Sequence, residues 1–110
     1  MEEKNRIKML EKEIYNDGCT NLEYFYEVLR YHVDVSGKYK KAYSICVLAP
    51  QSREIPRDAE NHSIYHWEFD AYFALAAFRA GFYEEAWRIQ KNLLYHNHHS
   101  VTALPWLTNS

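Results

Sequence analysis

Two seven-residue stretches decide the fold: residues 37–43 read GKYKKAY, and residues 81–87 read GFYEEAW. Gly, Tyr and Ala recur at the same places, 44 residues apart (81 − 37 = 44), whereas two lysines are replaced by two glutamates. Glycine ends a helix because it adopts a left-handed backbone without a Cβ clash. The alanine one turn later leaves room for a crossing helix. We therefore expect two helix–turn–helix units in which the repeated residues pack and the Lys and Glu pairs face water.

Apolar residues on either side of these turns follow the 3.6-residue period of helices. Ile7, Leu10 and Ile14 form one face of a first helix, which ends at residues 16–18. Pro50 ends the third helix because it restricts the preceding residue and lacks an N–H donor. We expect one domain over 1–110, with a leading helix at 1–16, a repeat unit at 21–49, a polar loop at 50–63, a second repeat unit at 64–95 and a C-terminal tail at 96–110.

Composition favours an all-α fold. Aromatic residues make up 16% of the chain, so large rings supply much of the packing, and three Gly and three Pro are too few for a turn-rich β fold. The formal charge of −2 predicts no nucleic-acid partner, and no apolar run is long enough to span a membrane. A charged N-terminus and two cysteines without CxxC spacing are typical of a cytoplasmic protein with reduced thiols.

The pattern G-x-Y-x-x-A inside a two-helix unit resembles the tetratricopeptide repeat. This resemblance implies about five helices in antiparallel hairpins, arranged as a short right-handed tetratricopeptide-like stack. A compact five-helix bundle is the alternative architecture. The spacing of 44 residues exceeds the roughly 34 residues of that repeat, and the loop at 50–63 supplies the excess.

A longer resemblance covers about residues 6–95. This stretch is similar to the helical region that follows the catalytic domain in some family 2 glycosyltransferases. The nucleotide-sugar domain of that family is not in this sequence, so the resemblance implies a helical accessory module and not transferase activity. The residues that match its pattern are Ile64, Tyr65, Trp67, Asp70, Gly81, Tyr83, Leu93 and Leu94.

A partner-binding groove is expected along the first helix of each repeat unit. The side chains expected to line it are Tyr24, Glu27, Tyr31 and Asp34 in the first unit and Trp67, Glu68, Leu75 and Phe78, with Ala71 beside them, in the second. The helix at about 64–80 is apolar on almost every side and is therefore expected to be buried on every side.

Three occupants could cover Leu75 and Phe78 in this groove: the C-terminal tail, a second copy of the chain, or a different protein. The tail would use Val101, Leu104, Trp106 and Leu107. Repeat arrays usually need three or more units, and this sequence has two with a leading helix. That shortage favours a homodimer or a bound protein partner.

The residue pattern predicts no catalytic, cofactor or metal site. His62 and His66 lie four residues apart, but no cysteine or acidic residue completes a known zinc spacing. No base lies near Cys19 in sequence, and Cys46 lies in an apolar run typical of a core. Three further histidines, His96, His98 and His99, cluster near the C-terminus.

The leading functional hypothesis is a non-enzymatic protein-interaction or accessory module with an aromatic-rich helical groove. The alternative is a small stand-alone regulator or inhibitor that docks on an enzyme, as some phage-encoded proteins do. A histidine-rich metal-binding protein is the third hypothesis.

Overall fold

The structure, a computed structural model, describes residues 2–16 and 18–96. Within these residues the fold is all-α, with five α-helices and no strand, which confirms the predicted fold class. The expected contacts of Val101, Leu104, Trp106 and Leu107, and the expected tail histidines His98 and His99, lie outside the described residues. No described helix is long and apolar enough to cross a membrane.

The helices follow the predicted order closely. Two of them are extended by π-helical segments, η1 and η2, which the 3.6-residue pattern does not distinguish from ordinary helix. The elements are α1 (Glu2–Asn16), α2 (Leu22–Tyr31), η1 (His32–Ser36), α3 (Tyr39–Leu48), η2 (Ile64–Glu68), α4 (Phe69–Arg79) and α5 (Tyr83–His96).

Local sequence explains where the helices begin and end. The side chain of Asn21 caps α2 by accepting a hydrogen bond of 2.9 Å from the backbone N–H of Glu23. Gly37, with φ of 67°, and Gly81, with φ of 96°, take the left-handed conformation at the two turns. Ala49 is extended before Pro50, so α3 stops there.

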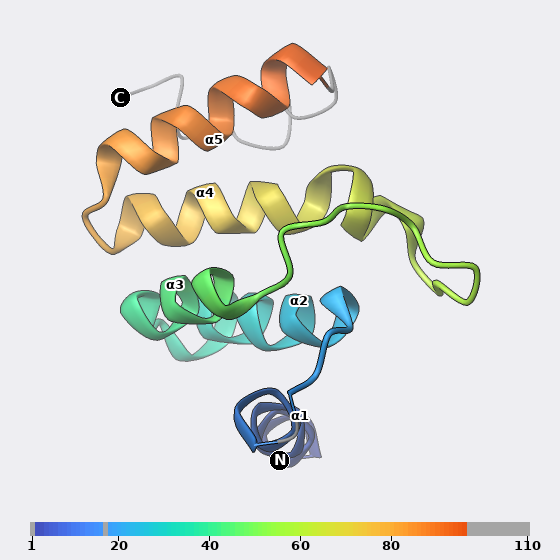
Figure 1. The fold of residues 1–110 in the computed structure, drawn as a ribbon. Helices are drawn as coiled ribbons and strands as arrows, with labels where there is room; N and C mark the ends of the chain where they lie inside the picture. Colours follow the sequence, from blue (N-terminus) through green and yellow to red (C-terminus); the bar gives the residue numbers. More distant parts are fainter. Residues whose placement is uncertain (1, 17, 97–110) are drawn as a thin grey trace.

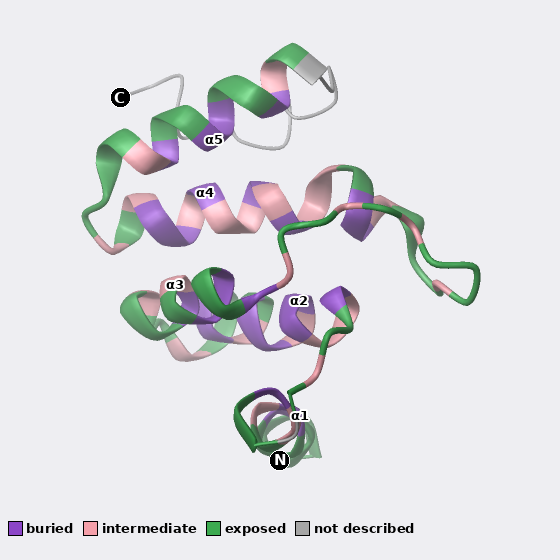
Figure 2. Cartoon of the chain, in the orientation of Figure 1, coloured by how far each residue is buried: buried purple, intermediate pink, exposed green. Residues whose placement is uncertain are grey.

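The helices form a layered stack, with α1 at one end and α5 at the other (Figure 1). α2 and α3 form the first hairpin, α4 and α5 form the second, and α4 packs against α3. The buried residues follow the inner faces of the layers, whereas the outer side of α5 is mostly exposed (Figure 2). The second hairpin therefore packs on the first, an arrangement compatible with both a repeat stack and a compact five-helix bundle.

Large side chains of α2, α3 and α4 meet in the larger core cluster, and α5 packs on α4 through a second, smaller cluster. Phe25, Leu29, Ile45 and Phe69 are all at most 2% exposed. Burying each such side chain stabilises the fold by about 1.5–3 kcal/mol. The two repeat alanines, Ala42 and Ala86, are fully buried. Their small size lets the paired helices approach, as the repeat predicts.

The Lys and Glu pairs of the repeated turns were expected to face water, which would leave the sign of their charge free. Lys40, Lys41 and Glu84 are exposed as expected, and Glu85 is half-buried. The Lys41 ammonium lies 3.0 Å from Glu11 of α1, and Glu85 accepts a hydrogen bond from the hydroxyl of Tyr43 of α3. Each side chain therefore ties the second helix of its unit to a helix of the preceding layer, so the sign of its charge is fixed by its partner.

The long loop at 50–63 is held against the helices at both ends. The backbone N–H groups of Glu60 and Asn61 donate to the Glu23 carboxylate at 3.2 and 3.0 Å, and the Tyr65 hydroxyl donates to the same carboxylate at 3.0 Å. Burial, followed by the hydrogen bond to Glu23, raises the pKa of Tyr65 to about 12. The loop is therefore part of the packed structure.

Candidate functional site

The predicted groove residues of the first unit lie along α2 and η1. Tyr24, Glu27 and Tyr31 are half-buried, and Asp34 is exposed. Glu27 accepts two hydrogen bonds, of 2.9 and 3.2 Å, from Arg6 of α1. Asp34 accepts a hydrogen bond of 2.7 Å from the Tyr72 hydroxyl of α4. The carboxylates of Glu27 and Asp34 therefore both have partners within the chain.

The predicted groove residues of the second unit divide between two sides of α4. Glu68 accepts a hydrogen bond of 2.9 Å from the Tyr26 hydroxyl of α2, and Leu75 packs against the larger core cluster. Trp67 and Ala71 belong with the smaller cluster beside α5, and Phe78 contacts the Tyr83 ring edge-on with centroids 5.3 Å apart. Phe78 is half-buried, and its contact with Tyr83 is with the first residue of α5.

Tyrosine–carboxylate pairs join α2 to α4. The Tyr26 and Tyr72 rings meet edge-on with centroids 5.6 Å apart, and their hydroxyls donate to Glu68 and Asp34. Burial, followed by the hydrogen bond to Asp34, raises the pKa of Tyr72 to about 12, and burial and Glu68 raise that of Tyr26 further. Both hydroxyls therefore remain donors even above the pH at which an ordinary tyrosine ionises, and this side of the stack is joined by internal hydrogen bonds.

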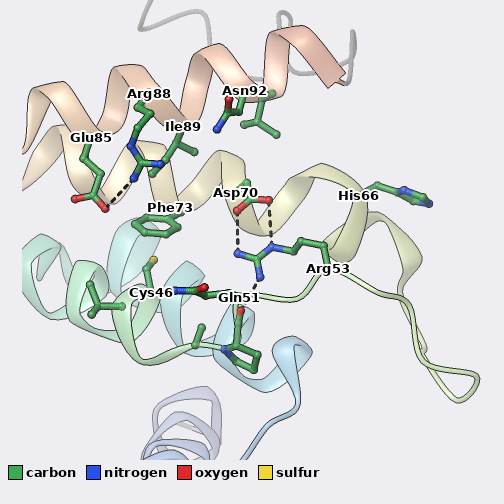
Figure 3. A pocket seen from close by; sticks show the side chains of 14 residues that line it. Cys46, Gln51, Arg53, His66, Asp70, Phe73, Glu85, Arg88, Ile89 and Asn92 are labelled. Carbon is green, nitrogen blue, oxygen red and sulfur yellow. Dashed lines mark hydrogen bonds and ion pairs between the residues drawn. The ribbon is translucent and has the colours of Figure 1, made fainter.

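A large cleft lies on another side of the stack, between α3, the start of the loop, α4 and α5 (Figure 3). Its volume is about 610 Å³. Arg53 enters it from the loop and pairs with both carboxylate oxygens of Asp70, at 3.2 and 3.0 Å. The same guanidinium donates to the Pro50 carbonyl at 2.6 Å and lies 4.8 Å from the Phe69 ring centroid. Arg53 thereby fixes the loop to α4.

The opposite wall of this cleft also carries paired charges. Arg88 lies 3.7 Å from Glu85, which accepts the hydrogen bond from Tyr43 (Figure 3). Cys46 lies at the floor, and burial raises the pKa of its thiol well above the usual value. A protonated thiol is a poor nucleophile. The cleft is therefore a polar recess whose charges already satisfy one another.

The two repeat units differ in exposure at the residue after the repeated alanine. In the first unit this residue is Tyr43, whose ring stacks on Phe82 with centroids 4.4 Å apart and meets Phe73 edge-on at 6.1 Å. In the second unit it is Trp87, which is 59% exposed. No described residue covers Trp87 as Phe73 and Phe82 cover Tyr43. The packing surface that one unit offers to the next is thus open on α5.

Two other exposed aromatic side chains lie on α5. Tyr83, equivalent to Tyr39 of the first unit, is 63% exposed, and Tyr95 on the last turn of α5 is also exposed. Tyr39, by contrast, is half-buried, with the Arg79 guanidinium 5.8 Å from its ring centroid. We call Tyr83, Trp87 and Tyr95 the α5 outer face. Aligning the two units in sequence pairs Tyr83 with Tyr39 and Trp87 with Tyr43. The alignment does not show which member of each pair is exposed, because exposure depends on neighbouring helices.

The groups proposed for metal or thiol chemistry lie apart. His62 and His66 are both exposed, and His66 lies at the rim of the large cleft. No group of three His, Cys, Asp or Glu side chains among the described residues is arranged to hold a metal ion. Cys19 is half-buried and Cys46 buried, and both are free thiols.

Comparison with protein-family models, with curated proteins and with solved structures finds no match for this chain. The likeness to the tetratricopeptide repeat and to the glycosyltransferase helical region therefore stays a prediction.

Proposed function

We propose that this protein is a non-enzymatic interaction module that packs a helix pair of another chain against the α5 outer face. In the simplest assembly, the other chain is a second copy. One observation carries the proposal: Tyr43 is covered by aromatic rings of the next unit, whereas its repeat equivalent Trp87 is 59% exposed. A large aromatic surface in a position that otherwise packs against helices is typical of an interface.

The chemistry of the face supports a helical partner. In the repeat, the ring at this position packs against one aromatic side chain on a helix and another at a helix turn, namely Phe73 and Phe82. A partner that offers rings with the same spacing would complete the packing of Trp87. Tyr and Trp suit such anchors because they bury large area with few rotatable bonds. The resemblance to a glycosyltransferase accessory region agrees with this role.

Light scattering on a size-exclusion column over a range of protein concentrations tests the proposal. The intact chain should move from monomer toward dimer as concentration rises. The double variant Tyr83→Ser/Trp87→Ser should stay monomeric, because it removes two anchors from the α5 outer face. Hot-spot residues of this kind each contribute about 2 kcal/mol or more to binding.

A matched control changes two exposed apolar residues at the other end of the stack. Met9 and Tyr15 of α1 are 60% and 49% exposed. The variant Met9→Ser/Tyr15→Ser should associate as the intact chain does. Association that is unchanged in the α5 variant, or lost in the α1 variant, would place the interface elsewhere. Circular dichroism of both variants checks that the helices are intact.

A further inference from the structure

A second cavity lies at the opposite end of the stack from the α5 outer face, between α1, η1 and the start of α3. Its volume is about 340 Å³, which is in the lower range of small-molecule sites. Four lysines line it: Lys4 and Lys8 from α1, Lys38 and Lys41 from the turn and first turn of α3. The chain has seven lysines and a net charge of −2. Most of its lysines therefore gather at one cavity of an acidic protein.

The repeat itself does not require lysine at positions 38 and 41. The repeated turn of the second unit has Phe82 where the first unit has Lys38, and Glu85 where the first has Lys41. Only Lys41 has an acidic partner, since its ammonium lies 3.0 Å from Glu11. Within the described part of the chain, Lys4, Lys8 and Lys38 form no ion pair. With one carboxylate against four ammonium groups, the cavity carries a net positive charge.

A buried imidazole lies in the cavity wall. His32 is 3% exposed, and its Nδ1 lies 2.8 Å from the hydroxyl oxygen of Ser36. Its Nε2 faces Glu11 Oε1 at 3.5 Å, and the other oxygen of the same carboxylate pairs with Lys41. The ring is therefore held in the wall between Ser36 and Glu11, close to the lysines.

The backbone adds positive potential at the same place. Gly37, with φ of 67°, turns the chain so that Lys38 precedes the first residue of α3. The side chain of Lys38 does not cap the helix, and Lys38 and Lys41 both line the cavity. The N–H groups at the start of a ten-residue helix carry a partial positive charge that favours anions.

We propose that this cavity binds a small phosphomonoester whose phosphate lies among Lys4, Lys8 and Lys38. A phosphate monoester carries close to two negative charges at neutral pH and three strong acceptor oxygens, which matches several ammonium donors better than a carboxylate does. Tyr31 and Ile7 provide the uncharged part of the wall, where the organic group of the ester lies. The cavity size favours a small molecule over a folded partner.

Isothermal titration calorimetry with phenyl phosphate tests this assignment, with phenyl sulfate as a probe of the same shape and lower charge. Phenyl phosphate should bind with a dissociation constant of about 1 mM or tighter, and at least about tenfold more tightly than phenyl sulfate. Inorganic phosphate is the third probe. If it binds as tightly as phenyl phosphate, the site takes free phosphate and the assignment to an ester is overturned.

The seven lysines offer a matched pair of variants. Lys4→Gln/Lys8→Gln/Lys38→Gln removes three charges from the cavity and keeps the Lys41–Glu11 pair. Lys12→Gln/Lys40→Gln/Lys91→Gln removes three charges from lysines that do not line it. The first should weaken phenyl phosphate binding at least about tenfold and the second less than about twofold. Equal weakening in both would mean general charge attraction and would overturn the site.

A measurement on the intact chain covers the case in which the first variant does not fold. The nuclear magnetic resonance signals of the His32 ring protons should shift as phenyl phosphate is added, because the ring lies in the cavity wall. The ring signals of His62, which is exposed and outside the cavity, should stay unchanged. Unchanged His32 signals, or no heat of binding at about 10 mM probe, would refute the proposal.

Discussion

Replacing Tyr43 by alanine should destabilise the fold far more than replacing Trp87, although the two residues occupy equivalent places in the repeat. The Tyr43 ring stacks on Phe82 with centroids 4.4 Å apart and an interplanar angle of 19°, and its hydroxyl donates to Glu85. Trp87 is 59% exposed and has no comparable cover among the described residues. The difference arises because the second unit packs on the first and covers Tyr43, whereas no described helix packs on the second unit over Trp87.

The expected costs follow from these contacts. Truncating a fully buried aromatic side chain to alanine costs about 3–5 kcal/mol, and Tyr43 is half-buried. Its ring contacts contribute about 0.5–1.5 kcal/mol beyond burial, and its hydrogen bond a similar amount. We therefore expect Tyr43→Ala to cost about 2–3 kcal/mol. Trp87→Ala, a surface substitution in the monomer, should stay within about 0.5 kcal/mol.

Urea unfolding at low protein concentration, followed by circular dichroism, measures both costs. With a slope of about 1–3 kcal/mol per molar urea, Tyr43→Ala should lower the midpoint by about 0.7–3 M, and Trp87→Ala should move it by less than about 0.5 M. Tyr43→Phe keeps the ring and isolates the hydrogen bond to Glu85, at a cost of about 0.5–1 kcal/mol. Equal losses for Tyr43→Ala and Trp87→Ala would refute the reasoning that the second unit covers the first.

Three further substitutions test local features of the fold by the same urea method. Arg53→Lys should cost about 1–2 kcal/mol, because lysine cannot pair with both oxygens of Asp70, and an unchanged midpoint would show that the loop is held otherwise. Gly37→Ala should cost about 1 kcal/mol from the backbone alone, since φ is 67° and an added Cβ meets no atom within 4 Å; a neutral result would contradict the left-handed turn. Burial lowers the pKa of His32 below its usual 6.5, so the unfolded chain binds the extra proton first and stability falls as pH drops below about 6.5, by up to about 1.4 kcal/mol per pH unit. His32→Gln should remove that part of the pH dependence between about pH 7 and pH 5, and a variant with the same slope as the intact chain would contradict it.

The helix order could be predicted because each boundary depends on neighbouring residues. Asn21, Gly37, Pro50 and Gly81 act through their own backbone conformation or side chain, which sequence displays directly. The π-helical segments could not be predicted, because one extra residue per turn leaves the apolar spacing within the tolerance of a helical pattern. Their presence at His32–Ser36 brings the imidazole and the serine hydroxyl together.

The candidate sites were harder to predict because they depend on contacts between distant residues. Arg53 and Asp70 meet only because the loop folds back over α4, and Lys41 meets Glu11 only because α1 packs near α3. Aligning the two repeat units shows that Trp87 is equivalent to Tyr43. The alignment does not show which of the two rings is buried, because the burial of a ring depends on the helices of the next layer.

Hydroxyl-radical footprinting at low and high protein concentration tests the central claim, that the α5 outer face docks a helical partner, most directly. The method reports which side chains lose solvent exposure when chains associate. We predict that oxidation of Tyr83 and Trp87 falls as concentration rises, while that of Met9 and Tyr15 on α1 stays constant. Protection of Met9 and Tyr15 with unchanged Trp87, or no protection while the measured mass doubles, would contradict the claim.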